Sequence, residues 1–158
     1  MQYLIDGHNL IPNIHGLSLS DPDDETKLLD LLNRFQRIRR ASITVFFDQA
    51  PIGRHGVRKH GSVRAVFVPT GKTADTAIME ALTKNKVAAK LVTLVSSDRQ
   101  VQAAGRERRA TIVSSSQFGQ DIEVALAEEP KRPVEVASDN ADEIEEWLNL
   151  FSNSKPED

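Results

Sequence analysis

Three aspartates stand where short apolar runs end, and together they could hold a divalent cation. Asp6, Asp48 and Asp98 each follow a run rich in aliphatic, β-branched or aromatic residues, Asp98 after two intervening serines. If these runs are neighbouring strands of a parallel sheet, their carboxylates lie at one sheet edge, roughly 5–10 Å apart. Carboxylates at that spacing repel one another, and Mg²⁺ or Mn²⁺ would relieve the repulsion.

Each acid also has a local explanation. Asp6 and Asp48 precede segments containing glycine or proline, where an aspartate can begin a turn. Asp98 and Asp75 stand at expected helix starts, where a negative charge is favoured in any protein. The joint pattern is more informative than any single member, and it favours a site at one edge of a sheet.

Basic residues gather near the second aspartate. Residues 34–64 contain eight Lys+Arg and a single acid, Asp48. We expect the segment after Asp48 to be a loop that rises from the acid edge, although a solvated surface loop is the alternative. Bases there would bind a nucleic-acid backbone with salt-sensitive affinity and little sequence reading. The expected nucleic-acid-binding residues of this loop, which would bind RNA if the substrate is RNA, are Arg54, His55, Arg58, Lys59 and His60.

Two further residues have several open roles. Lys72 comes just before an expected helix and could contact a phosphate or remain on the surface. His8 could stack on a base, ligate the metal or pack within its loop. Both are included among the expected RNA-binding residues.

The apolar pattern predicts strands that alternate with helices. Strands are expected at residues 2–5, 42–47, 64–68, 91–95 and 110–113, and helices near 24–39, 74–85, 99–108 and 117–127. Such alternation is typical of an α/β fold with a mostly parallel sheet, here of about five strands, covered by helices on both faces.

Charge and proline content divide the chain of 158 residues. Residues 1–127 hold 17 Lys+Arg and 13 Asp+Glu, a net charge of +4, and residues 128–158 hold 3 and 10, a net charge of -7. We expect a domain at 1–127, a linker at 128–138, and an acidic helix and tail at 139–158. That helix would dock on the domain or serve a partner through one apolar stripe, formed by Ile144, Trp147, Leu148 and Phe151.

Composition excludes several classes of protein. The chain has no cysteine, which excludes a disulfide scaffold, a thiolate zinc site and a cysteine nucleophile. Its first residues do not resemble a signal peptide, and no apolar run approaches the ~20 residues that span a bilayer. We expect a cytoplasmic protein without membrane association.

Three short motifs occur in an order that resembles a known family. They are DGHNLI at residues 6–11, TAD at 73–75 and SD at 97–98. This order is similar to that of NYN-domain proteins in the PIN-like nuclease superfamily, in particular the YacP-like bacterial branch. The resemblance covers about residues 1–127 and implies a PIN-like three-layer α/β sandwich whose first strand is central.

The resemblance also implies an activity and its residues. It implies a metal-dependent endoribonuclease with a catalytic carboxylate cluster of Asp6, Asp75 and Asp98. Asn9 would be a nearby polar support, and Asp48 a fourth metal-binding acid. The implied cofactor is Mg²⁺ or Mn²⁺. The implied substrate is RNA, and because YacP-like members include enzymes that act on ribosome-engaged mRNA, the ribosome is a candidate partner.

Other functions stay open at this stage. Lys72 stands where the branch often has an acid, and Thr76 where it often has an acid or a serine, which favours an RNA- or ribosome-binding module with weak or no catalysis. A phosphatase that uses Asp6 as nucleophile is a third alternative. That alternative is disfavoured because residue 8 is a histidine, whereas such a site would need a second aspartate there.

Overall fold

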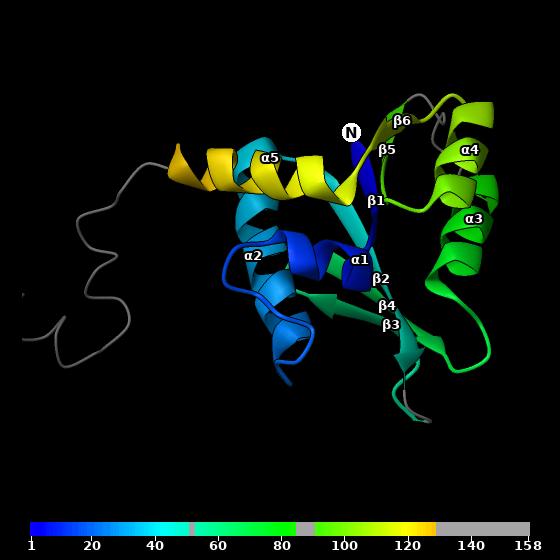
Figure 1. The fold of residues 1–158 in the computed structure, drawn as a ribbon, viewed down its shortest axis with the longest axis horizontal. Helices are drawn as coiled ribbons and strands as arrows, with labels where there is room; N and C mark the ends of the chain where they lie inside the picture. Colours follow the sequence, from blue (N-terminus) through cyan, green and yellow to red (C-terminus); the bar gives the residue numbers. More distant parts are fainter. Residues whose placement is uncertain (51–52, 85–90, 129–158) are drawn as a thin grey trace, which may run out of the picture. The chain divides into compact units, whose positions relative to one another are not determined.

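The computed structural model of the chain describes residues 1–50, 53–84 and 91–128. Within them a six-stranded sheet lies between two groups of helices (Figure 1). The strands are β1 (Gln2–Asp6), β2 (Ser42–Ala50), β3 (Gly56–His60), β4 (Val63–Pro69), β5 (Val92–Val95) and β6 (Thr111–Val113). The helices are α1 (Gly7–Leu10), the 3₁₀ turn η1 (Ile11–Asn13), α2 (Asp24–Arg39), α3 (Ala74–Lys84), α4 (Arg99–Glu107) and α5 (Ser115–Ala127).

All these elements belong to one compact unit, Met1–Ala127. The acidic helix and tail expected at 139–158, and all but Glu128 of the linker expected at 128–138, lie outside the described residues. No helix in the described ranges is both long and apolar enough to span a bilayer.

The sheet places the first strand at its centre. Its strand order is β3-β4-β2-β1-β5-β6, and every neighbouring pair is parallel except β3 with β4. β1 therefore lies between β2 and β5, with Asp6 opposite Phe46 and Ile5 opposite Val95. The strands that precede Asp6, Asp48 and Asp98 are neighbours, as the strand-end argument required, and the mostly parallel α/β fold is confirmed.

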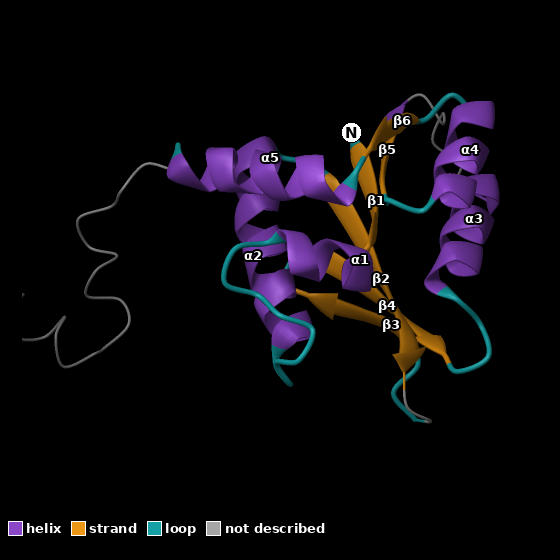
Figure 2. Ribbon diagram, viewed as in Figure 1, coloured by secondary structure: helices purple, strands orange, loops and turns teal. Residues whose placement is uncertain are grey.

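The two sheet faces are covered by different helices. α2, α5 and α1 lie on one side and α3 and α4 on the other (Figure 2). Under α2 and α5, Tyr3 of β1 contacts the rings of Phe35 and Phe118, at centroid distances of 5.8 and 5.2 Å. On the opposite face Leu4 joins a separate apolar cluster beneath α3 and α4. This alternation along β1 fixes which way each strand-end residue points.

The segment after β2 differs from the expectation. Residues 56–60 were expected in a loop, but they form the edge strand β3, which pairs antiparallel with β4. A tight turn through Gly61, at φ 63°, joins the two strands. An edge strand pairs on one side only and is exposed here along most of its length, so it needs no apolar run. For that reason the hydrophobic pattern did not reveal it.

Candidate active site

Asp6 is the most enclosed acid at the strand ends. It ends β1 and caps α1, where its Oδ1 accepts a hydrogen bond of 3.3 Å from the backbone N–H of Asn9. The residue is only 9% exposed. Burial raises the pKa of its carboxyl to about 6; the Asn9 hydrogen bond and the charge of His8 oppose this rise, and the charges of Asp75 and Asp48 add to it. An acid so poorly compensated is suited to a bound cation.

Asp75 and Asp98 face the same place from two helix starts. Asp75 lies in the first turn of α3, and its pKa is raised, first by burial and then by the charge of Asp98 and a hydrogen bond with it. Asp98 caps α4 with Oδ1, which accepts from the backbone N–H groups of Gln100 and Val101 at 2.9 and 3.0 Å. The cap fixes the Asp98 carboxylate in position.

Asp48 and His8 form an ion-paired group beside this cluster. The Nδ1–H of His8 donates to Asp48 Oδ1 at 2.9 Å, and its Nε2–H donates to Glu25 Oε2 at 2.7 Å. The hydrogen bond to Glu25 is the largest cause that raises the pKa of His8 to about 9. Because both ring nitrogens of this imidazolium carry a donated proton, neither has a lone pair for a metal. Of the roles left open for His8, packing and pairing within the loop fit this geometry.

Asn9 holds three strand-end loops together. Its Oδ1 accepts from the backbone N–H of Ser97 at 2.9 Å and from the hydroxyl of Ser115. The backbone N–H of Ser115, a fully buried residue, donates to Ser97 Oγ at 3.2 Å. This network joins the ends of β1, β5 and β6. Ser97 belongs to the SD motif, but the sequence assigned no role to it, and Ser115 was not singled out; the only signal for Ser115 was a small polar residue soon after a strand.

The carboxylates suit a hard divalent cation, although they do not enclose one in their present positions. Among the residues described, no group of three or more His, Asp or Glu side chains is arranged to hold a metal ion. Asp75 nevertheless lies close enough to both Asp6 and Asp98 for each to affect the pKa of its carboxyl, and burial keeps the pKa of Asp6 raised. A set of oxygen donors with excess negative charge matches Mg²⁺ or Mn²⁺, which are often bound partly through water. The residues present therefore fit the implied metal.

The basic residues divide between the two ends of β3. Arg54 and His55 lie just before β3, near the carboxyl end of β4 and the acids. The guanidinium of Arg58 lies over the ring of Phe67, 5.7 Å from its centroid. Because β3 runs antiparallel to β4, it carries Lys59 and His60 toward the opposite edge of the sheet.

Two predicted RNA-binding residues already have acidic partners. His60 Nε2 lies 2.7 Å from Asp30 Oδ1 on α2. Lys72 Nζ donates to Glu80 Oε1 at 2.6 Å on α3. The expectation of one continuous basic loop at the acid edge is therefore wrong: Arg54, His55 and Lys72 lie near that edge, whereas Lys59 and His60 do not.

Comparisons with known proteins match the chain to one family and one fold. The family model described as YacP-like NYN domain matches residues 3–154. The crystal structure of Rae1 (YacP) from Bacillus subtilis is 21% identical, with a TM-score of 0.70 over 99% of this chain and 95% of that one. Its W164L mutant is 22% identical, with a TM-score of 0.67 over 95% and 91%. No curated protein matches the sequence. At these identities the likeness to solved structures establishes the fold.

Proposed function

Because the chain belongs to the family of YacP-like NYN domains, we propose that it is a metal-dependent endoribonuclease that hydrolyses RNA phosphodiester bonds. The observation that carries the proposal is the buried carboxylate of Asp6 beside the carboxylate of Asp75, which in turn lies beside Asp98. The proposed site is the carboxyl edge of the central strands.

The proposed roles follow from the contacts. Asp6, Asp75 and Asp98 hold the metal, directly or through water, with Asp48 as a fourth acid. Bound there, Mg²⁺ or Mn²⁺ supplies an activated water and neutralises charge on the phosphate. His8 fixes the orientation of the Asp48 carboxylate through Nδ1–H.

The remaining site residues hold the loops and the substrate. Asn9 keeps the Asp98 loop in register with β1 through its bond to Ser97. Arg54, His55, Arg58 and Lys72 neutralise phosphates of the bound strand, which positions RNA without reading its sequence. Cytoplasmic mRNA on the ribosome is the proposed setting, supported by the family resemblance.

An RNA- or ribosome-binding module without catalysis is the second candidate. The observation that favours it is that the described carboxylates are not preassembled around a metal. Both candidates predict RNA binding, so metal-dependent cleavage separates them.

The test compares the wild type with Asp75→Asn, which keeps the shape of a partly exposed residue. Calorimetric titration with Mn²⁺ is run beside cleavage of a mixed RNA pool, free and on programmed ribosomes. We expect the variant to lose Mn²⁺ affinity and at least 100-fold in cleavage rate, while RNA binding in EDTA is retained. Asp30→Asn, an acid-to-amide change on α2 at the His60 end of β3, is the matched control and retains activity.

Two results would count against the proposal. The absence of Mn²⁺ binding and of cleavage in the wild type, with RNA and ribosomes present, would reject catalysis and leave the RNA-binding module as the better description. Cleavage by Asp75→Asn at the wild-type rate would instead reject the assigned carboxylate site.

A further inference from the structure

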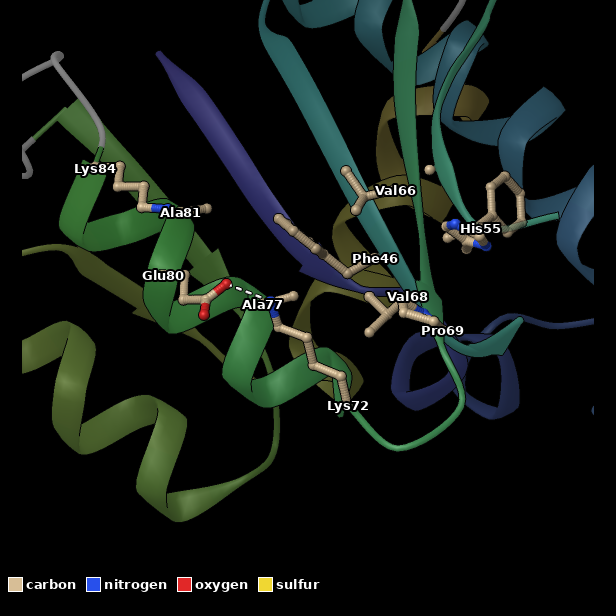
Figure 3. A pocket seen from close by; sticks show the side chains of 12 residues that line it. Phe46, His55, Val66, Val68, Pro69, Lys72, Ala77, Glu80, Ala81 and Lys84 are labelled. Atoms are coloured by element: carbon tan, nitrogen blue, oxygen red, sulfur yellow. Dashed lines mark hydrogen bonds and ion pairs between the residues drawn. The ribbon is translucent and has the colours of Figure 1, made fainter. Parts of the chain in front are cut away.

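An open hollow lies between α3 and the sheet (Figure 3). Its volume is about 340 Å³. Phe46, Val66 and Val68 line it from the sheet, and Ala77 and Ala81 line it from α3. Four polar side chains complete the lining: His55, Lys72, Glu80 and Lys84. The hollow thus combines apolar walls with charged groups of predominantly positive sign.

The hollow exists because α3 covers only part of its sheet face. α3 packs against β1 and β2. Val66 and Val68 of β4 face the α3 side, and Val57 of β3, paired with Val66, is 63% exposed. A second hollow of about 410 Å³ continues over this outer part, and it shares Phe46 and Val66 and adds Arg64. Together the two hollows form a groove across the sheet face.

One end of the groove opens near the proposed catalytic acids. Lys72 precedes Asp75 by three residues. Pro69, which also lines the hollow, pairs with Ala50, two residues after Asp48. A strand that leaves the acid edge in this direction enters the hollow directly.

We propose that this hollow binds one unpaired nucleobase of the RNA, adjacent to the phosphodiester that is cleaved. This inference rests on the proposed function and adds a base subsite to it. The apolar side chains of Phe46, Val66 and Ala81 contact the base, and Lys72, Lys84 and His55 attract the flanking phosphates. The Glu80 carboxylate, now paired with Lys72, is the one carboxylate among the described residues of this lining, and it accepts a hydrogen bond from a base N–H group such as N3–H of uracil.

Charge and shape favour a nucleotide over other occupants. Lys72, Lys84 and Arg64 outnumber Glu80 around the two hollows, so the groove attracts an anionic chain. Ligand pockets are typically about 300–1,000 Å³, and this hollow lies at the small end of that range. An acidic peptide is also anionic, but its side chains have no flat apolar surface to pack against the apolar lining of the hollow.

The experiment fills the hollow with a larger side chain and compares an RNA probe with one that lacks nucleobases. Ala81→Phe places a ring in the groove from the last turn of α3, at a half-buried position. Thr83→Phe is the matched control, because Thr83 is exposed on the same helix and does not line either hollow. Affinity is measured in EDTA by fluorescence anisotropy with two labelled probes, a 12-nucleotide oligouridylate and an abasic 12-mer that keeps every phosphate.

Base binding predicts a specific pattern across the four measurements. Ala81→Phe weakens oligouridylate binding by about 5- to 100-fold, the range expected for one lost base contact. It leaves the abasic probe within twofold of wild type, and Thr83→Phe changes neither probe. Equal weakening of both probes, or no change in either, overturns the base subsite.

A further measurement tests an acidic peptide as the occupant. If Ala81→Phe loses affinity for a labelled 12-residue polyglutamate while its RNA affinity stays intact, the hollow is reassigned to an acidic protein segment and the proposal is overturned. If thermal melting shows that Ala81→Phe does not fold, Ala81→Leu takes its place. Failure of the proposed function is seen in the cleavage assay and not in these binding measurements. It appears there as absence of cleavage in the wild type, or as cleavage that Asp75→Asn leaves intact.

Discussion

The single residue Asp6 links the stability of the protein to its proposed activity. A carboxylate that is 9% exposed, and whose pKa burial raises to about 6, destabilises the folded chain when it is ionised. The same burial beside other carboxylates is what makes it suitable for binding a cation. Without metal, the protein should therefore have a lower unfolding free energy than a variant with an uncharged side chain at position 6.

Asp6→Asn is expected to stabilise the metal-free protein at neutral pH. The folded-state pKa is raised from 3.8 to about 6, so the folded state holds a proton that the unfolded chain loses earlier. Wild-type stability therefore falls as pH rises from about 4 to about 6, and stays low above that. The asparagine removes this loss and keeps an oxygen for the Asn9 N–H. Urea unfolding in EDTA should show a gain of about 1–3 kcal/mol at pH 7.

Two measurements check the origin of that gain. At pH 4, where Asp6 is largely protonated in the folded state, wild type and variant should differ little. Added Mn²⁺ should stabilise the wild type more than the variant. A gain of the same size at pH 4 and pH 7 would contradict the electrostatic explanation.

His8 carries the opposite pH dependence. Its pKa is raised from 6.5 to about 9, chiefly by the hydrogen bond to Glu25, so its ion pairs stabilise the fold fully below pH 6.5. That contribution is lost as the pH rises through about 9. Because the side chain is 29% exposed, we expect only about 1–2 kcal/mol. The unfolding free energy of wild type minus that of His8→Gln, measured from pH 6 to 10, should shrink between about pH 6.5 and about pH 9; a constant difference would contradict this role.

At the scale of elements, the strand and helix pattern was predictable from the sequence. The run before Asp6 alternates between two buried faces, and α2 has the expected bounds, 24–39, because its apolar residues recur at helical spacing. β3 was not predictable, because its exposed Arg58 and Lys59 carry no apolar signal. A local hydrophobic pattern does not reveal an exposed edge strand that is paired on one side only.

The candidate site was predictable only in part. Acids at strand ends could be assigned to one edge because parallel strands share their direction. The His8–Glu25 pair and the Asn9–Ser115 contact join residues 17 and 106 positions apart. No local pattern encodes such contacts, since they depend on how the loops pack once the sheet has formed.

The packing of α5 against η1 can be tested at the scale of elements. A Cβ at Gly119 would lie 2.3 Å from the backbone oxygen of Asn13, so Gly119→Ala must displace η1 or α5. We expect a loss of about 1–3 kcal/mol in urea unfolding.

Gly105→Ala is the matched control on α4. There the new Cβ meets the terminal methyls of Ile112 and Leu94, at 2.6 and 2.7 Å, and these side chains can move; Ala110 Cβ lies at an ordinary contact distance of 3.9 Å. The gain in helix propensity, about 1 kcal/mol, offsets much of that cost. Equal losses for the two variants would show that α5 is not held by backbone contact.

At the scale of the whole molecule, net charge gives a misleading impression of its partners. The chain carries -3, but residues 1–127 carry +4. Arg54, His55 and Lys72 lie near the acid edge, where a phosphate backbone would have to pass. RNA affinity should therefore depend on where the cations lie and not on the total charge.

The salt dependence of RNA binding tests this arrangement. For a single strand, the slope of log affinity against log salt changes by about 0.7 for each phosphate contact. Arg54→Ala and Arg58→Ala should each reduce the slope of wild type by about that amount, measured with a 12-nucleotide RNA in EDTA. Lys59→Ala should leave it unchanged, because β3 carries Lys59 away from the acid edge. A loss of slope in Lys59→Ala as large as in Arg58→Ala would instead mean that the strand follows the whole of β3, and the path of the RNA would then cross the sheet rather than follow its acid edge.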